Sequence, residues 1–209
     1  MYTCTIDHLK YILLAIMMIP ALAYGQSKIY YPGNVLKAEG ALSGGKKEGT
    51  WRFYYPNSQL SSIENYRQGE LHGSVTYYDP GGSIIGVENW QHGLPEGKAT
   101  HFYPNGQIEK EGSYVNGLYQ GDWRFYHNNG QLKRNVNYEE GLPHGRWVYY
   151  SESGVILQQG AYEKGKETGI WQFYSQEGML EFKGEYKNGQ RVGTWYRVTK
   201  KGKKKPARY

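Results

Sequence analysis

The stretch 121-GDWRFYHNNGQLKRNVNYEEGLPHG-145 decides the fold, because the chain copies this unit again and again. It starts with an aromatic run at residues 123–126, and such residues favour β-strands. Asn129 and Gly130 then tolerate positive φ angles and can close a tight turn. A second run at residues 131–138 follows, and a glycine-bounded loop at residues 141–145 ends the unit. The stretch therefore predicts one β-hairpin.

The unit recurs with a fixed step of 24 residues and without insertions. Its boundary glycines are Gly49, Gly73, Gly97, Gly121, Gly145, Gly169 and Gly193. Twenty-four residues leave no room for a helix of about ten residues beside two strands. We therefore predict an all-β fold, an elongated antiparallel meander of about seven 24-residue β-hairpin repeats plus a closing strand, over residues 28–199. The pattern weakens at Val75, Asp79 and Ala99, where we expect the lowest local stability.

The turn also predicts how the strands pair. If Asn129 and Gly130 form a two-residue loop, the second residue of each unit faces the fifteenth, so that Trp147 lies over Gly160 and Trp171 over Gly184. Tyrosines at the seventeenth position then share the face of the tryptophans. A three-residue loop shifts the pairing by one residue and sends the tryptophans to the opposite face. We favour the first arrangement.

The fifth position of the unit carries a second aromatic row, which the favoured pairing puts on the face opposite the tryptophans. Exposed aromatic rows suit glycans or peptides, because each ring offers rigid apolar area with a polar tip. The alternative is that this row is the packing of the sheet itself. The candidate binding ladder consists of Tyr54, Tyr78, Phe102, Tyr126, Tyr150 and Tyr174.

Residues 1–23 predict a secretory signal peptide. The nine apolar residues 11–19 are far fewer than the ~20 that span a bilayer, and a small-residue cleavage motif follows at residues 21–23. We expect cleavage between residues 23 and 26 and an exported protein in the periplasm, the cell envelope or the medium; the alternative is an uncleaved anchor. The only cysteine, Cys4, lies in this segment, so the mature chain has no disulfide and no thiolate metal site. It also has no predicted transmembrane segment.

The net charge of +6 resides in the C-terminal tail, residues 200–209. The tail contains no acid, and its cations are Lys200, Lys201, Lys203, Lys204, Lys205 and Arg208. Each cation adds about 1 kcal/mol of attraction near an acidic membrane, so the tail is a candidate for binding an anionic surface. The alternative is a solvated terminus. We do not expect nucleic acid as a partner of an exported protein.

The chain contains no motif that predicts catalysis. No two histidines have the spacing of a zinc site, and no pair of carboxylates is singled out for glycoside hydrolysis. A serine nucleophile elbow is also absent from the sequence. We therefore expect no enzymatic activity, no cofactor and no metal.

The units YPNGQIEKEGSYVNGLYQG (103–121) and SQEGMLEFKGEYKNGQRVG (175–193) resemble the variant MORN repeat of bacterial proteins. The shared features are the NG or EG turn, the G-x-Y-x-x-G run and the closing glycine, and the resemblance covers residues 28–199. Where the eukaryotic MORN pattern has H-G-x-G, this chain has H-G-x-W at residues 144–147, so the lipid recognition of some eukaryotic members is not carried over.

The resemblance implies an elongated β-hairpin sheet with a non-catalytic scaffolding or binding role. Our leading hypothesis is an exported repeat scaffold that presents an extended surface to a protein, a glycan or another envelope component. The alternative is an antitoxin or immunity protein that neutralises a partner by direct binding. A carbohydrate-active enzyme is a third, distant possibility.

Overall fold

The computed structural model describes residues 25–199 and 201–207. These residues form one open antiparallel sheet of 17 strands and contain no helix. The expected signal peptide with Cys4, and the tail residues Lys200 and Arg208, lie outside the described residues. The strands are β1 (Gly25–Tyr30), β2 (Leu36–Ser43), β3 (Lys46–Tyr54), β4 (Leu60–Arg67), β5 (Glu70–Leu71), β6 (Gly73–Tyr78), β7 (Ile84–Gln91), β8 (Leu94–Phe102), β9 (Ile108–Val115), β10 (Leu118–Tyr126), β11 (Leu132–Glu139), β12 (Leu142–Tyr150), β13 (Ile156–Glu163), β14 (Lys166–Tyr174), β15 (Leu180–Lys187), β16 (Gln190–Val198) and β17 (Lys204–Pro206).

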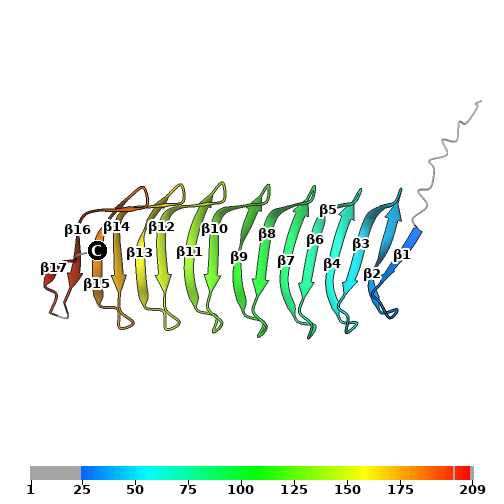
Figure 1. Ribbon diagram of the computed structural model, residues 1–209, viewed down its shortest axis with the longest axis horizontal. Helices are drawn as coiled ribbons and strands as arrows, with labels where there is room; N and C mark the ends of the chain where they lie inside the picture. The colour runs from blue at the N-terminus through cyan, green and yellow to red at the C-terminus, as the bar shows by residue number, and fades with distance from the viewer. Residues whose placement is uncertain (1–24, 200, 208–209) are drawn as a thin grey trace, which may run out of the picture.

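Each strand pairs with its neighbour in the sequence, so the hairpins stand in a row along one long axis (Figure 1). One strand is interrupted: β5 and β6 both pair with β4 and are separated only by His72. The predicted all-β meander of 24-residue hairpins is therefore confirmed. Because the sheet is a single layer, every described repeat presents both of its faces outward.

The turn at Asn129 and Gly130 is longer than predicted. Only Gly130 has a positive φ there, and its amide donates to the His127 carbonyl oxygen at 2.8 Å. The loop therefore contains three residues, 128–130. Lys133 is a β-bulge, because its neighbours pair while it is skipped: Leu132 pairs with Tyr126, and the next pair is Arg134 with Phe125.

This bulge preserves the predicted register in spite of the longer loop. A three-residue loop alone would shift the pairing by one residue, and the extra residue in the second strand, Lys133, reverses that shift. The same irregularity recurs in the other hairpins. As a result, Trp147 pairs with Gly160 and Trp171 with Gly184, as predicted.

The predicted loop at residues 141–145 is wrong in extent. Glu140 and Gly141 alone form a two-residue turn with positive φ at both positions, which is the type I′ geometry that suits the twist of antiparallel strands. Strand β12 begins directly afterwards, at Leu142. Gly145 lies inside β12 with φ +77°, at the point where the pairing with β11 shifts. The boundary glycine thus forms part of a β-bulge within the strand, where its positive φ would be strained for a residue with a side chain.

The core is a stack of aromatic rings on one face of the sheet, which we call the tryptophan face. Four tryptophans are almost fully buried there: Trp51, Trp123, Trp171 and Trp195. A Cβ added at Gly160 would collide with the indole of Trp171, and Trp195 covers Gly184 in the same way. The pairing was therefore predicted correctly, but the covering was not. Each indole leans over the glycine of the preceding repeat, so Trp171 covers Gly160 rather than Gly184.

The covering glycine also determines whether the indole N–H is satisfied. Trp171 Nε1 donates to the Ala161 carbonyl oxygen at 3.2 Å, and the other three buried tryptophans make the equivalent hydrogen bond. Trp147 is the exception, because the preceding repeat has Val136 in place of glycine. Its ring is only half-buried, and its Nε1 is shielded from water without a hydrogen-bond partner.

Hydrogen bonds at the turns link neighbouring repeats, a feature that the residue spacing does not predict. Where the sixth position carries tyrosine or histidine, its side chain reaches the backbone carbonyl 23 residues further along the chain, as Tyr103 does when its hydroxyl donates to the Tyr126 carbonyl at 2.9 Å. At the opposite edge, turn amides bond to the preceding repeat, as in Gly141 to the Tyr119 carbonyl at 3.0 Å. Hydrogen bonds between neighbouring repeats therefore form among the turns at both ends of the strands.

Part of the basic tail belongs to the fold. Lys204–Pro206 forms β17, which pairs with the end of β16, and the amide of Ala207 donates to the Trp195 carbonyl at 2.7 Å. The side chains of residues 201–206 remain exposed. The cations of the tail are thus carried partly on a strand of the sheet and not on an independent segment.

Candidate functional site

The candidate ladder lies on the face opposite the tryptophans, and all six of its residues are half-buried. Several of its polar tips already have partners on the same face. The Tyr54 hydroxyl donates to Glu39 at 2.8 Å and the Tyr126 hydroxyl to Glu111 at 2.7 Å. Burial, together with these carboxylates, raises the pKa of both tyrosines. The ladder therefore combines packing within the sheet with accessible ring area.

A hollow of about 490 Å³ lies beside the ladder between two neighbouring repeats. Its lining is mainly apolar and includes Ile84, Val87 and Phe102. Ile84 is 44% exposed, which makes it one of the large apolar side chains most open to solvent. This part of the face thus offers a concave apolar surface next to an aromatic ring.

The tryptophan face is interrupted in the two repeats that begin at Gly73 and Gly97. Val75 and Ala99 stand in the tryptophan position and are both buried. In each case the glycine that a tryptophan would cover is also replaced, by Glu64 and by Glu88. Carboxylate side chains thus fill the volume that indoles fill elsewhere. The sequence contained a signal for this exchange, since a glutamate stands 11 residues before each missing tryptophan.

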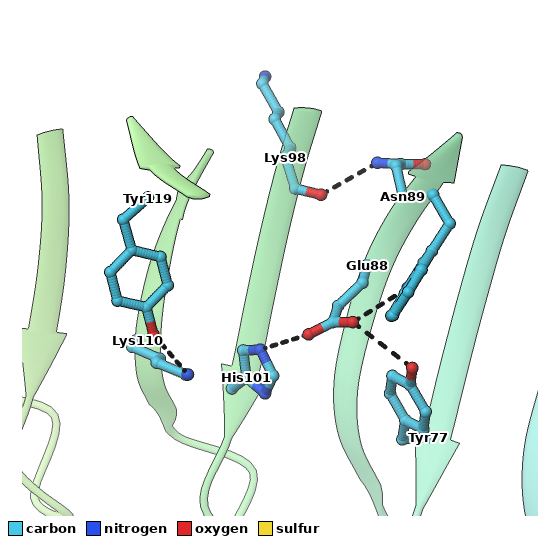
Figure 2. A network of polar contacts seen from close by, with 8 residues as sticks. Tyr77, Glu88, Asn89, Lys98, His101, Lys110 and Tyr119 are labelled. Carbon is cyan, nitrogen blue, oxygen red and sulfur yellow. Dashed lines mark hydrogen bonds and ion pairs between the residues drawn. The ribbon is translucent and has the colours of Figure 1, made fainter. Parts of the chain in front are cut away.

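Glu88 is 8% exposed and lies in a network of polar contacts (Figure 2). His101 Nε2 lies 3.0 Å from one carboxylate oxygen. The other oxygen accepts hydrogen bonds from Trp90 Nε1 at 3.0 Å and from the Tyr77 hydroxyl at 3.4 Å. His101 holds the pKa of Glu88 below its usual value in spite of burial, which acts in the opposite direction. Burial, reinforced by the charge of Glu88, raises the pKa of Tyr77.

Glu64 has a similar environment one repeat earlier. Its oxygens accept hydrogen bonds from Ser62 Oγ at 2.7 Å and from the Tyr66 hydroxyl at 2.5 Å. Burial lowers the pKa of Lys47, whose Nζ lies 4.5 Å from the centre of the Tyr66 ring. Both glutamates therefore accept hydrogen bonds from neighbouring side chains, and Glu88, which is buried, belongs to a polar part of the core.

No group of three or more metal-ligating side chains occurs among the described residues. The part of the chain that the structure describes also has no helix long and apolar enough to cross a membrane.

Tandem hairpins of fixed length, stacked edge to edge in one sheet, define a β-hairpin repeat protein. Five stretches of the chain, residues 47–68, 95–116, 119–140, 143–164 and 167–188, match the family model of the MORN repeat variant. Together they make up more than half of the chain, and the chain belongs to this family. The resemblance inferred from the sequence is confirmed. The family model does not match residues 69–94, the region that contains Val75 and Glu88.

No curated protein matches the chain in sequence. Among solved structures, the crystal structure of TcdB2-TccC3-Cdc42 is 14% identical with a TM-score of 0.23, and the match covers 86% of this chain but 12% of that one. The crystal structure of a porin-like protein from Bacteroides uniformis is 8% identical with a TM-score of 0.20, and the match covers 76% of this chain and 88% of that one. TM-scores this low support no conclusion about fold or function.

Proposed function

We propose that the protein is an exported, non-enzymatic scaffold that binds a protein, a glycan or another envelope component on the ladder face of its sheet. The observation that carries the proposal is the combination of six half-buried aromatic residues in register with an apolar hollow of about 490 Å³ beside Phe102. Rings held at a fixed spacing provide contact area with little loss of conformational entropy on binding. Repetition multiplies such contacts along one partner.

Variants of the ladder test this binding role. We expect the double substitution Phe102→Ala and Tyr126→Ala to weaken co-sedimentation with purified cell-wall sacculi, or cross-linking to proteins of the envelope fraction, by tenfold or more. Tyr196 is 37% exposed and lies outside the ladder, so Tyr196→Ala is the matched control. Equal losses in both variants, with unchanged melting curves, would refute a role for the ladder.

Export is tested separately. The apolar stretch at residues 11–19 and the small residues at 21–23 support a cleaved signal peptide. N-terminal sequencing of protein from the native host should start between Tyr24 and Ser27. Folded protein that retains Met1 would refute the proposal that the protein is exported with cleavage of a signal peptide. The alternative of an immunity protein requires a single tight protein partner encoded beside it, and co-purification of such a toxin would favour it over the scaffold.

A further inference from the structure

A second hollow, of about 380 Å³, is unusually rich in cations. Its lining includes Lys110, Lys133 and Arg134, against a single carboxylate, Glu109. His101 also borders it, but that ring is already paired with Glu88. Lys110 and Arg134 occupy the same repeat position in successive hairpins, and Lys133 is the bulge residue beside Arg134. The repeat therefore gathers positive charge at one place on the tryptophan face.

Arg134 is held in place by rings from the strands on both sides of it. Its Cζ lies 4.1 Å from the ring centre of Phe125 on β10 and 5.5 Å from that of Trp147 on β12. Arginine stacked on aromatic rings keeps the hydrogen-bonding edge of its guanidinium available for another group. The Nε atom of Arg134 is shielded from water and has no hydrogen-bond partner. Such an unpaired donor is costly to bury.

The charges of the hollow are not balanced by their neighbours. Neither Lys133 nor Arg134 forms an ion pair with a carboxylate among the described residues. Two other cations do form ion pairs with carboxylates, Lys28 with Glu39 at 3.8 Å and Arg124 with Glu111 at 3.6 Å. The hollow thus contains three cations, Lys110, Lys133 and Arg134, against one lining carboxylate, Glu109.

We propose that this hollow is a subsite for a carboxylate carried on a sugar ring, such as the uronic acid of an acidic glycan. The guanidinium edge of Arg134 matches the two oxygens of a planar carboxylate, and Lys133 adds a second positive charge. Phe125 and Tyr126 also line the hollow, so aromatic side chains lie beside the cations. A volume of about 380 Å³ is at the lower end of the range for ligand sites, which suits a single ring.

The proposal rests on the glycan-binding part of the function proposed above, but it places the acidic sugar on the tryptophan face, opposite the ladder. It is tested by titrating the purified protein with glucuronate while NMR or calorimetry reports binding. Glucose is the neutral match for glucuronate; N-acetylglutamate presents the carboxylate without a sugar ring, and inorganic phosphate presents a different anion. We expect saturable binding of glucuronate that weakens as salt is added, at least tenfold weaker binding of glucose, and weaker binding of the other two probes.

Two variants and one matched control locate the site. Arg134→Met keeps an apolar stem against Phe125 but removes the guanidinium, and we expect it to weaken glucuronate binding at least tenfold. Lys133→Met should weaken it severalfold. Lys37 occupies the same bulge position in the first hairpin, with its Nζ 5.4 Å from the ring centre of Tyr31, so Lys37→Met removes the same charge elsewhere and should leave binding unchanged.

Several results would overturn the assignment. These are the absence of saturable glucuronate binding, equal binding of glucose, or equal losses in Lys37→Met and Lys133→Met. Tight binding of phosphate or N-acetylglutamate through Arg134 would replace the acidic sugar with another ligand. The outcome is separable from that of the scaffold proposal. Failure here, with envelope binding still lost in the Phe102→Ala and Tyr126→Ala variant, removes the subsite and leaves the ladder intact.

Discussion

Replacing Trp171 with alanine should destabilise the protein by about 3–5 kcal/mol, the range observed for buried aromatic side chains. The side chain is 3% exposed, and its ring lies over Gly160. It also contacts the rings of Tyr162 and Tyr186 edge-on, at centroid distances of 5.2 and 5.8 Å. Truncation therefore removes a ring that joins three neighbouring strands and leaves the Ala161 carbonyl without its indole donor.

The same substitution at Trp147 is the matched comparison. Its ring is half-buried above Val136, so less contact area is lost, and its unpaired Nε1 already costs the folded state part of its stability. We therefore expect Trp147→Ala to cost about 1–3 kcal/mol, clearly less than Trp171→Ala.

Urea unfolding followed by far-UV circular dichroism measures both free energies, provided that fluorescence gives the same midpoint. Tyr150→Ala, in the half-buried ladder, serves as a control with a smaller expected cost. Equal destabilisation at Trp147 and Trp171, or a larger loss at Trp147, would refute the conclusion that a covering glycine determines how much each tryptophan contributes.

Three further predictions concern charged groups. Because His101 lowers the pKa of Glu88 in the folded state, this glutamate contributes stability at neutral pH that is lost as the pH falls below about 4.5. The melting temperature of Glu88→Gln should therefore depend less on pH between pH 6 and 3 than that of the unaltered protein. The same pH dependence in both proteins would contradict this prediction. Because burial raises the pKa of Tyr77, its contribution is present below pH 10 and lost above it, so the unfolding free energy of Tyr77→Phe should fall less steeply between about pH 10 and 11.5, as urea titrations would show. Deletion of residues 203–209 should lower the melting temperature because it removes β17. Replacing Lys203, Lys204 and Lys205 with glutamine should keep the fold but weaken salt-sensitive binding to anionic vesicles. An unchanged melting curve after the deletion would refute a structural role for β17.

The repeat step predicted the fold because every copy of the unit carries the same local signals. Glycines at fixed positions, aromatic strands and short turns agree with one another, so the hairpins and their register follow from the sequence. The details of the turns did not follow. A three-residue loop with a bulge at Lys133 produces the same register as the two-residue loop that the sequence favoured, and residue spacing alone does not separate the two.

The side-chain arrangement was predictable only in part. The pairing of Trp171 with Gly184 was correct, but the indole leans over Gly160 instead, where the pairing of β13 with β14 is irregular, and residue spacing does not specify that direction. The sequence does show that the two repeats without a tryptophan, at Val75 and Ala99, also have a glutamate 11 residues earlier, at Glu64 and Glu88. That the two changes are linked becomes clear only when the structure places these positions next to each other. The cationic hollow near Arg134 brings together residues of different hairpins, which no local pattern describes.

The hydrogen bonds between repeats give the molecule a mechanical property. Successive strands are joined by hydrogen bonds along the long axis of the row (Figure 1), so tension applied at the two ends would act along these bonds. A released 24-residue hairpin stretches to about 80 Å, in place of the ~10 Å that two strands occupy in the sheet. Each hairpin opened under tension would therefore lengthen the chain by about 70 Å.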